Sequence, residues 1–186
     1  IFLYPMALSF IVTGTVWKWM LNPGQGIEKL MRQAGFEDFT FDWLVNSDYA
    51  IYTVVIAAVW QSSGYAMALF LAGLRSVDDV ILKAAAIDGA NRWQTFRRVT
   101  LPLLRPALAL SLILAVTGSL LAFDQFFILT KGGPDNTTVT IVQLIYREAF
   151  LRLDLGTAAA LSIVVLVALL LLNTVQFRGL RVGRDA

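Results

Sequence analysis

The side chains that most often do chemistry in proteins are scarce in this sequence. It contains no cysteine and no histidine, which removes thiol nucleophiles, imidazole acid–base catalysis and the usual zinc sites. Intramembrane aspartyl chemistry needs two carboxylates, yet Asp124 is the only acid inside the long apolar stretches. No serine in those stretches has a lysine or histidine convincingly placed to act as its base. We therefore expect no catalytic residue and no metal site in this chain.

Polar residues inside the apolar stretches are the other candidates for function. The most prominent block is QSSGY at residues 61–65, in the middle of an expected span over residues 49–74. Polar groups in hydrocarbon need partners, so part of this helix must face protein or water. Small residues recur at every fourth position from Gly64 to Ala72, which favours helix–helix packing. A substrate-facing role for Gln61 and Ser62 is the alternative interpretation.

A second set of polar residues lies in the apolar stretch over residues 106–130. Ser111 and Ser119 share one face of the expected helix, and this face either packs or lines a cavity. Asp124 falls on the opposite face of the same helix, near its end. A buried acid is costly unless it is paired, which makes Asp124 a functional candidate. The alternative that we favour is a charge at the interface that orders residues 132–134.

The composition places these residues in a membrane. Hydrophobic residues make up 58% of the 186 and charged residues 15%, against about 45–50% and 25% in average soluble domains. No acid or base occurs between Asp48 and Arg75, or between Asp154 and Arg178. At about 1.5 Å per helical residue, each run exceeds the roughly 30 Å hydrocarbon thickness. We predict an all-α, polytopic transmembrane bundle with four spans, at about 1–21, 49–74, 106–130 and 155–177.

The distribution of charge predicts the orientation of these spans. Nine of the fifteen basic residues lie in the loop 75–105 and in the tail after Phe177, and the positive-inside rule makes both cytoplasmic. The connections 22–48 and 131–154 then face outward, with a short amphipathic helix expected near 26–34 and a helical lead-in over 138–153. Because the chain opens at Ile1 in an apolar stretch without a charged amino-terminal region, we expect that an earlier part of the protein is missing.

The sequence of the loop 75–105 predicts ordered structure rather than a flexible linker. Ser76 and Asp79 have the spacing of a capping box that starts a helix. Asp88-Gly89 interrupts this helix, since glycine tolerates the left-handed backbone at a helix end, and a second helix is expected before Leu101-Pro102. Small residues line the corner. This composition suits docking into a cleft of a soluble partner or an amphipathic hairpin on anionic lipid, and composition alone does not separate the two.

Two blocks of the sequence resemble a known family. The loop looks like the EAA loop of ABC importer permeases, and its IDGA version resembles that of the carbohydrate-uptake permeases related to the maltose and glycerol-3-phosphate systems. A second block agrees with the family in order and spacing. The resemblance implies a type I ABC importer permease fold, with residues 1–186 as a partial transmembrane domain. The matching pieces are KAAAIDGA (83–90), WQTF (93–96) and TLPLLRP (100–106), then FDQ (123–125), LTKGGP (129–134) and GTAAA (156–160).

The resemblance also implies roles for particular residues. A substrate path would include Gln61, Ser62, Ser119 and Phe123, because an aromatic ring stacks on a sugar while amide and hydroxyl groups bond its hydroxyls. One departure matters: Lys83 stands where the family usually has the glutamate that names the loop, so the charge facing the ATPase is reversed. The residues expected to couple the chain to the ATPase are Lys83, Ala84, Ala85, Asp88, Gly89, Ala90 and Arg92.

The family resemblance implies partners that supply what this chain lacks. No Walker-type phosphate-binding loop occurs in the sequence, so ATP and magnesium are expected on a partner ATPase dimer. A second homologous permease, an extracytoplasmic solute-binding protein and the lipid bilayer complete the expected set, with no nucleic acid. The expected function is carbohydrate import across the cytoplasmic membrane of a prokaryote. Import of glycerol-3-phosphate or glycerophosphodiesters is the alternative, followed by a membrane scaffold or an intramembrane enzyme.

Overall fold

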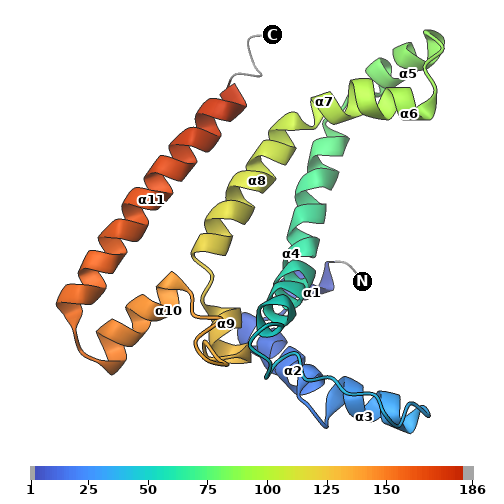
Figure 1. Ribbon diagram of the computed structural model, residues 1–186. Coiled ribbons are helices and arrows are strands. Elements are labelled where there is room, and N and C mark those ends of the chain that lie inside the picture. The colour runs from blue at the N-terminus through green and yellow to red at the C-terminus, as the bar shows by residue number, and fades with distance from the viewer. Residues whose placement is uncertain (1–2, 182–186) are drawn as a thin grey trace.

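The computed structural model describes residues 3–181, and this part of the chain is helical without a strand. Short helices at both ends of the molecule connect a few long ones (Figure 1). The helices are α1 (Tyr4–Ala7), α2 (Phe10–Leu21), α3 (Gly26–Gln33), α4 (Ala50–Arg75), α5 (Asp79–Ile87), α6 (Arg92–Thr95), α7 (Leu101–Leu103), α8 (Arg105–Leu120), α9 (Asp124–Leu129), α10 (Ile141–Tyr146) and α11 (Leu155–Arg181), with π-helical turns η1 (Phe96–Thr100) and η2 (Arg147–Leu151).

Two of the expected spans are single long helices. Helix α4 has 26 residues, and the candidate span within α11, Leu155–Gly179, has 25; both are long and apolar enough to cross a membrane. At about 1.5 Å per residue each exceeds the roughly 30 Å of hydrocarbon. A bent pair, Arg92–Leu103 with Arg105–Leu120, meets the same criteria together. The expected short helix near 26–34 and the helical lead-in over 138–153 are also present, as α3 and as α10 with η2.

The first apolar segment is broken rather than continuous. Leu8 and Ser9 have extended backbones (ψ 143° and 141°), and α2 starts afresh at Phe10. The Ser9 hydroxyl accepts a hydrogen bond from the Ile11 N–H at 3.3 Å, so it caps the new helix. Residues 1 and 2 of the expected span lie outside the described part. The break leaves the backbone carbonyl of Leu8 without a helical donor, and another element must supply one.

The third apolar segment is broken as well. Helix α8 ends at Leu120, and α9 begins only at Asp124. The expectation that Asp124 lies on the same helix as Ser119 is therefore wrong, and a helical face cannot be continued across the break. At its other end α8 meets the helical stretch 92–103 at an angle of 62°. Pro106 is in the first turn of α8, and proline cannot donate to the preceding turn, which accounts for a break beside it.

The described residues bury a small core at one end of the molecule. Leu44, Val54, Ala57 and Leu129 form this core, with Trp17 and Phe126 packed against them. These residues come from α2, the loop before α4, α4 itself and α9. Helix α2 passes very close to α9, because a Cβ on Gly14 would lie 2.9 Å from Ile128 Cγ2. The core therefore holds both broken segments against the amino-terminal half of α4.

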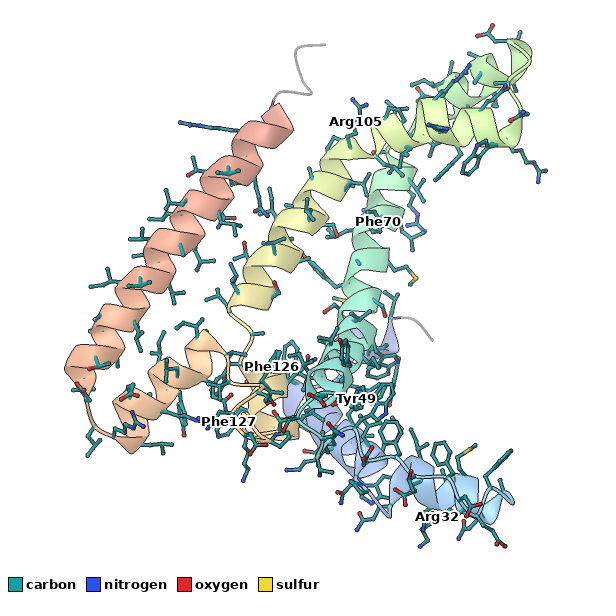
Figure 2. The ribbon with its side chains drawn as sticks, in the orientation of Figure 1. Arg32, Tyr49, Phe70, Arg105, Phe126 and Phe127 are labelled. Carbon is teal, nitrogen blue, oxygen red and sulfur yellow. The ribbon has the colours of Figure 1, made fainter. Side chains whose placement is uncertain are left out.

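A second contact between long helices lies at the opposite end of the molecule. Helix α4 packs there against α8, where a Cβ on Gly73 would lie 2.8 Å from the Ala107 side chain. Figure 1 shows α5 to α7 at the same end as the carboxyl end of α11, while α3 and the start of α11 lie at the other end. The loop 75–105 and the end of α11, both of which the charge distribution predicts to be cytoplasmic, thus lie at the same end of the molecule. Figure 2 places Arg105 at the bend between α7 and α8, and Phe126 and Phe127 at the far end.

Candidate functional site

Helix α5 is the first arm of the corner between α4 and α8. Its cap is Asp78, whose Oδ1 accepts a hydrogen bond from the Val80 N–H at 2.9 Å. The predicted Ser76–Asp79 capping box is therefore wrong by two residues. The Ser76 hydroxyl instead donates to the carbonyl of Gly73 at 2.7 Å, where it closes the end of α4. Ser76 and Asp78 are both favourable N-cap residues, and because the Ser76 hydroxyl is engaged at the end of α4, Asp78 caps α5.

The corner itself has the geometry that the sequence predicted. Gly89 has φ +77°, in the left-handed region. Its N–H donates to the carbonyl of Ala86 at 3.1 Å, and the Ala90 N–H donates to the carbonyl of Ala85 at 3.0 Å. These two bonds make a Schellman motif, which satisfies carbonyls that the helix end would otherwise leave unpaired. A Cβ added at Gly89 would meet nothing within 4 Å in this chain, so the corner faces open space.

The second arm starts with a capping box that the sequence analysis missed. The Asn91 Oδ1 accepts from the Gln94 N–H at 2.8 Å, and the Gln94 Oε1 accepts from the Asn91 N–H at 2.9 Å. An Asn followed three residues later by Gln was the available signal. The expectation that this helix ends before Leu101-Pro102 is wrong. The wider turn of η1 carries the chain through Pro102, because the Leu101 N–H bonds to Phe96.

All seven predicted coupling residues lie on or beside this corner. Lys83, Ala84, Asp88, Gly89 and Arg92 are exposed, whereas Ala85 and Ala90 are half-buried. The sequence analysis did not single out Ile87, which is 86% exposed at the last position of α5. An apolar side chain beside small residues and isolated charges is suited to a protein partner rather than to water.

The predicted substrate-path residues occupy different environments. Gln61 is 6% exposed, and its Nε2 donates to the Leu8 carbonyl at 3.3 Å while its Oε1 accepts from Gln125 Nε2 at 3.3 Å. Gln61 thus supplies the donor that the break in the first segment requires, and it joins three segments of the chain. The sequence marked Gln61 as a polar residue needing partners, but Gln125 was not among the candidates.

The other three residues of the predicted path are more accessible. Ser62 is exposed, and Ser119 is exposed with its hydroxyl donating to the Val116 carbonyl of its own helix at 2.9 Å. Phe123 is half-buried, with its ring stacked on Phe127 at 5.0 Å and near Tyr146 at 5.4 Å. Among residues 3–181 no hydrogen bond or ring contact joins the four path residues to one another. Their shared role in a path stays a prediction.

Asp124 does not order the loop 132–134, contrary to the favoured expectation. Asp124 is exposed at the start of α9. The loop is instead held by Thr138, whose hydroxyl donates to the Gly133 carbonyl at 2.7 Å, and by Arg147, whose Nη2 donates to the Lys131 carbonyl at 2.8 Å. Asp124 begins α9, whereas the loop follows the carboxyl-terminal end of that helix, so the two lie at opposite ends of α9.

A buried glutamate that the sequence analysis did not single out organises the arm around α3. The carboxylate of Glu28 accepts hydrogen bonds from the backbone N–H of Gly24 at 3.0 Å and of Phe41 at 3.2 Å, and it pairs with Arg32 at 2.7 Å. The two backbone donors are the main reason why the pKa of Glu28 is lowered below its usual 4.5. Figure 2 shows Arg32 out on this arm, away from the long helices.

Comparison with protein families matches residues 1–178 to the binding-protein-dependent transport system inner membrane component family. The chain belongs to this family. A probable ABC transporter permease protein of Pyrococcus horikoshii is 37% identical over 169 residues, which cover 90% of this chain and 58% of the relative. The sn-glycerol-3-phosphate transport system permease protein UgpA of Salmonella typhimurium is 38% identical over 182 residues, 95% of this chain and 59% of UgpA. The chain thus spans less than two thirds of the length of these relatives.

The fold agrees with that of a solved importer. A crystal structure of a bacterial ABC transporter involved in the import of the acidic polysaccharide alginate matches with a TM-score of 0.82 and 25% identity, covering 96% of this chain and 64% of that one. The predicted fold class, an all-α transmembrane ABC importer permease, is therefore confirmed. The predicted resemblance to carbohydrate and glycerol-3-phosphate permeases is confirmed as well.

Proposed function

We propose that this inner membrane component is the transmembrane permease subunit of an ATP-driven importer that moves a carbohydrate into the cytoplasm of a prokaryote by alternating access. Family membership and the fold support the proposal. The observation that carries it is the corner at Gly89, an ordered and exposed turn with open space beyond it. This corner lies at the end of the molecule where most of the basic residues are found. A scaffold needs no such corner.

The corner is proposed to dock into a cytoplasmic ATPase dimer, which binds ATP and magnesium. A closed Schellman turn is rigid, so movement of the ATPase would be transmitted to α4 and α8 through the two arms. A second homologous permease would complete the pathway, and an extracytoplasmic solute-binding protein would deliver the solute to the opposite end. Lys83 is exposed on the first arm, and we propose that it meets an acidic group where other members present a glutamate to their ATPase.

The solute is proposed to be a sugar or polyol, and the expected substrate path argues for a neutral one. Ser62 and Ser119 offer exposed hydroxyl groups without charge, and Phe123 offers an aromatic ring. No lysine or arginine lies in the middle of α4 or of α11. A phosphorylated or acidic solute would need a cation there or on the second permease.

Glycerol-3-phosphate is the second candidate, favoured by the relatives. The permease UgpA, at 38% identity, is named for that solute, and the solved importer moves an acidic polysaccharide. Both solutes are anionic. If this chain takes an anion, the compensating cation is expected on the partner permease.

The test is uptake by the full-length protein, reconstituted in proteoliposomes with its second permease, its ATPase and its solute-binding protein. Radiolabelled maltose, glycerol and glycerol-3-phosphate are supplied outside, with ATP inside. ATP-dependent accumulation of a neutral sugar or polyol is the expected result. Accumulation of glycerol-3-phosphate alone would select the second candidate, and no ATP-dependent accumulation of any carbohydrate or polyol phosphate would overturn the proposed function.

A further inference from the structure

The helical stretch 92–103 carries a basic and aromatic surface that the corner does not use. Trp93, Gln94, Arg97 and Arg98 line a groove of about 470 Å³. The Trp93 ring is 66% exposed and stacks on Phe96 at a centroid distance of 5.8 Å. We call these four lining residues the basic groove. Tryptophan with arginine is the combination that membrane–water interfaces favour.

The direction of this stretch keeps the basic groove close to the end of a span. The stretch meets α8 at 62°, and Arg98 lies six residues before the bend at Leu104, about 9 Å along the helix axis. With α8 along the bilayer normal, Arg98 stands about 4 Å and Trp93 about 8 Å beyond the end of the span. The headgroup layer is about 5–8 Å thick on each side. For this direction of α8, the groove lies at headgroup depth.

Most of the charges at this end lack ion-pair partners among residues 3–181. Residues 75–105 contain six lysines and arginines but three acids, and one of these acids, Asp78, caps α5. The two salt bridges found among residues 3–181, Glu28–Arg32 and Glu148–Arg152, are both at the opposite end. Arg97 and Arg98 are exposed and have no ion-pair partner in that range. An exposed excess of cations calls for an anionic partner.

We propose that the basic groove binds the phosphate group of anionic phospholipids in the facing leaflet, with Arg97 and Arg98 donating to phosphate oxygens and Trp93 anchored among the headgroups. Guanidinium groups match phosphate geometry, and juxtamembrane basic clusters concentrate anionic lipid near the protein. The bound lipid would hold the 92–103 stretch at a fixed depth and so set where the Gly89 corner stands. This inference needs only the cytoplasmic placement of this end, and it goes beyond the proposed transport function.

The test measures which lipid touches Trp93. The full-length protein is placed in phosphatidylcholine nanodiscs that contain one tenth of a brominated lipid, either brominated phosphatidylglycerol or brominated phosphatidylcholine. Bromine quenches nearby tryptophan, and the Trp93 signal is the difference between the protein and its Trp93→Phe variant. We expect brominated phosphatidylglycerol to quench Trp93 as if it were enriched about fivefold for each arginine engaged. High salt should reduce that enrichment.

Variants separate this groove from charge in general. The double variant Arg97→Gln/Arg98→Gln should quench equally with the two brominated lipids, and Arg97→Lys/Arg98→Lys should keep most of the preference. The control Lys29→Gln/Lys131→Gln, which removes two charges at the opposite end, should behave like the parent protein. Equal quenching of the parent by both lipids overturns the proposal. Loss of the lipid preference when the ATPase dimer is added also overturns it, because the groove would then be a protein interface. Since the first measurements omit the ATPase, their failure leaves the role of the Gly89 corner untouched.

Discussion

Replacing Gly89 by valine should weaken the assembly of the transporter without preventing insertion of the chain. The Gly89 backbone is left-handed, at φ +77°, a conformation that β-branched residues resist. Space is not the obstacle, because an added Cβ meets nothing within 4 Å in this chain. Any effect of the substitution therefore comes from backbone strain at the corner and from added bulk toward the partner.

The size of the effect follows from the geometry of the corner. A left-handed valine costs on the order of 1–2 kcal/mol. If the strain opens the turn, the bonds from Gly89 to Ala86 and from Ala90 to Ala85 are lost, at about 0.5–1.5 kcal/mol each. A docked state that requires the closed turn is then weakened by roughly 2 kcal/mol, which corresponds to about a thirtyfold rise in the dissociation constant. Gly89→Ala should give a smaller loss in the same direction.

The measurement is the binding of purified ATPase dimer to the full-length protein in nanodiscs, followed by ATP-driven uptake. Gly35→Val is the matched control, because Gly35 has φ +103° and also has nothing within 4 Å of an added Cβ, but it ends α3 at the opposite end. Its backbone strain should leave ATPase binding unchanged. Equal ATPase affinity for the Gly89→Val variant and the parent, with normal uptake, would refute the docking role of the corner.

Three further predictions test other parts of the chain. Single cysteines introduced at Asn91 and at Asn136 should react with a membrane-impermeant thiol reagent from opposite sides; reaction from the same side would contradict the topology. Gln61→Ala should lower the free energy of unfolding by about 0.5–2 kcal/mol, because the half-buried Leu8 carbonyl and the buried Gln125 amide lose their partner. Ser119→Ala should leave stability unchanged and raise the solute concentration needed for half-maximal uptake. An unchanged uptake profile for Ser119→Ala would remove it from the path. The pKa of Glu28 is lowered, so its charged form stabilises the α3 arm above pH 4.5, and this stabilisation is lost as the pH falls through the folded pKa. Proteolysis of the arm should accelerate as the pH falls through that range. The Glu28→Gln variant should be cleaved faster than the parent at pH 7, and both should be cleaved equally fast at low pH.

Local sequence was enough to predict the long helices and the corner. Uncharged runs of more than twenty residues can satisfy their backbone in a membrane only as helices, and α4 and α11 appear where expected. The corner depends on residues within one turn of Gly89, so glycine after a helix of good helix formers determines it. The error at Ser76 arose because serine and aspartate are both favourable N-cap residues. The end of α4 engages the Ser76 hydroxyl, so Asp78 caps α5 instead.

The breaks in the first and third apolar segments were decided by tertiary structure. Both segments are apolar enough to continue as helices, but the Leu8 carbonyl finds its donor in Gln61, 53 residues away. Gln125 completes that link only because α9 is a separate helix that packs against α2 and α4. No local pattern contains partners so distant along the chain. A polar residue in the middle of a span indicates that a hydrogen-bond partner is needed. Only the packing of the three segments shows that the partners of Gln61 are Leu8 and Gln125.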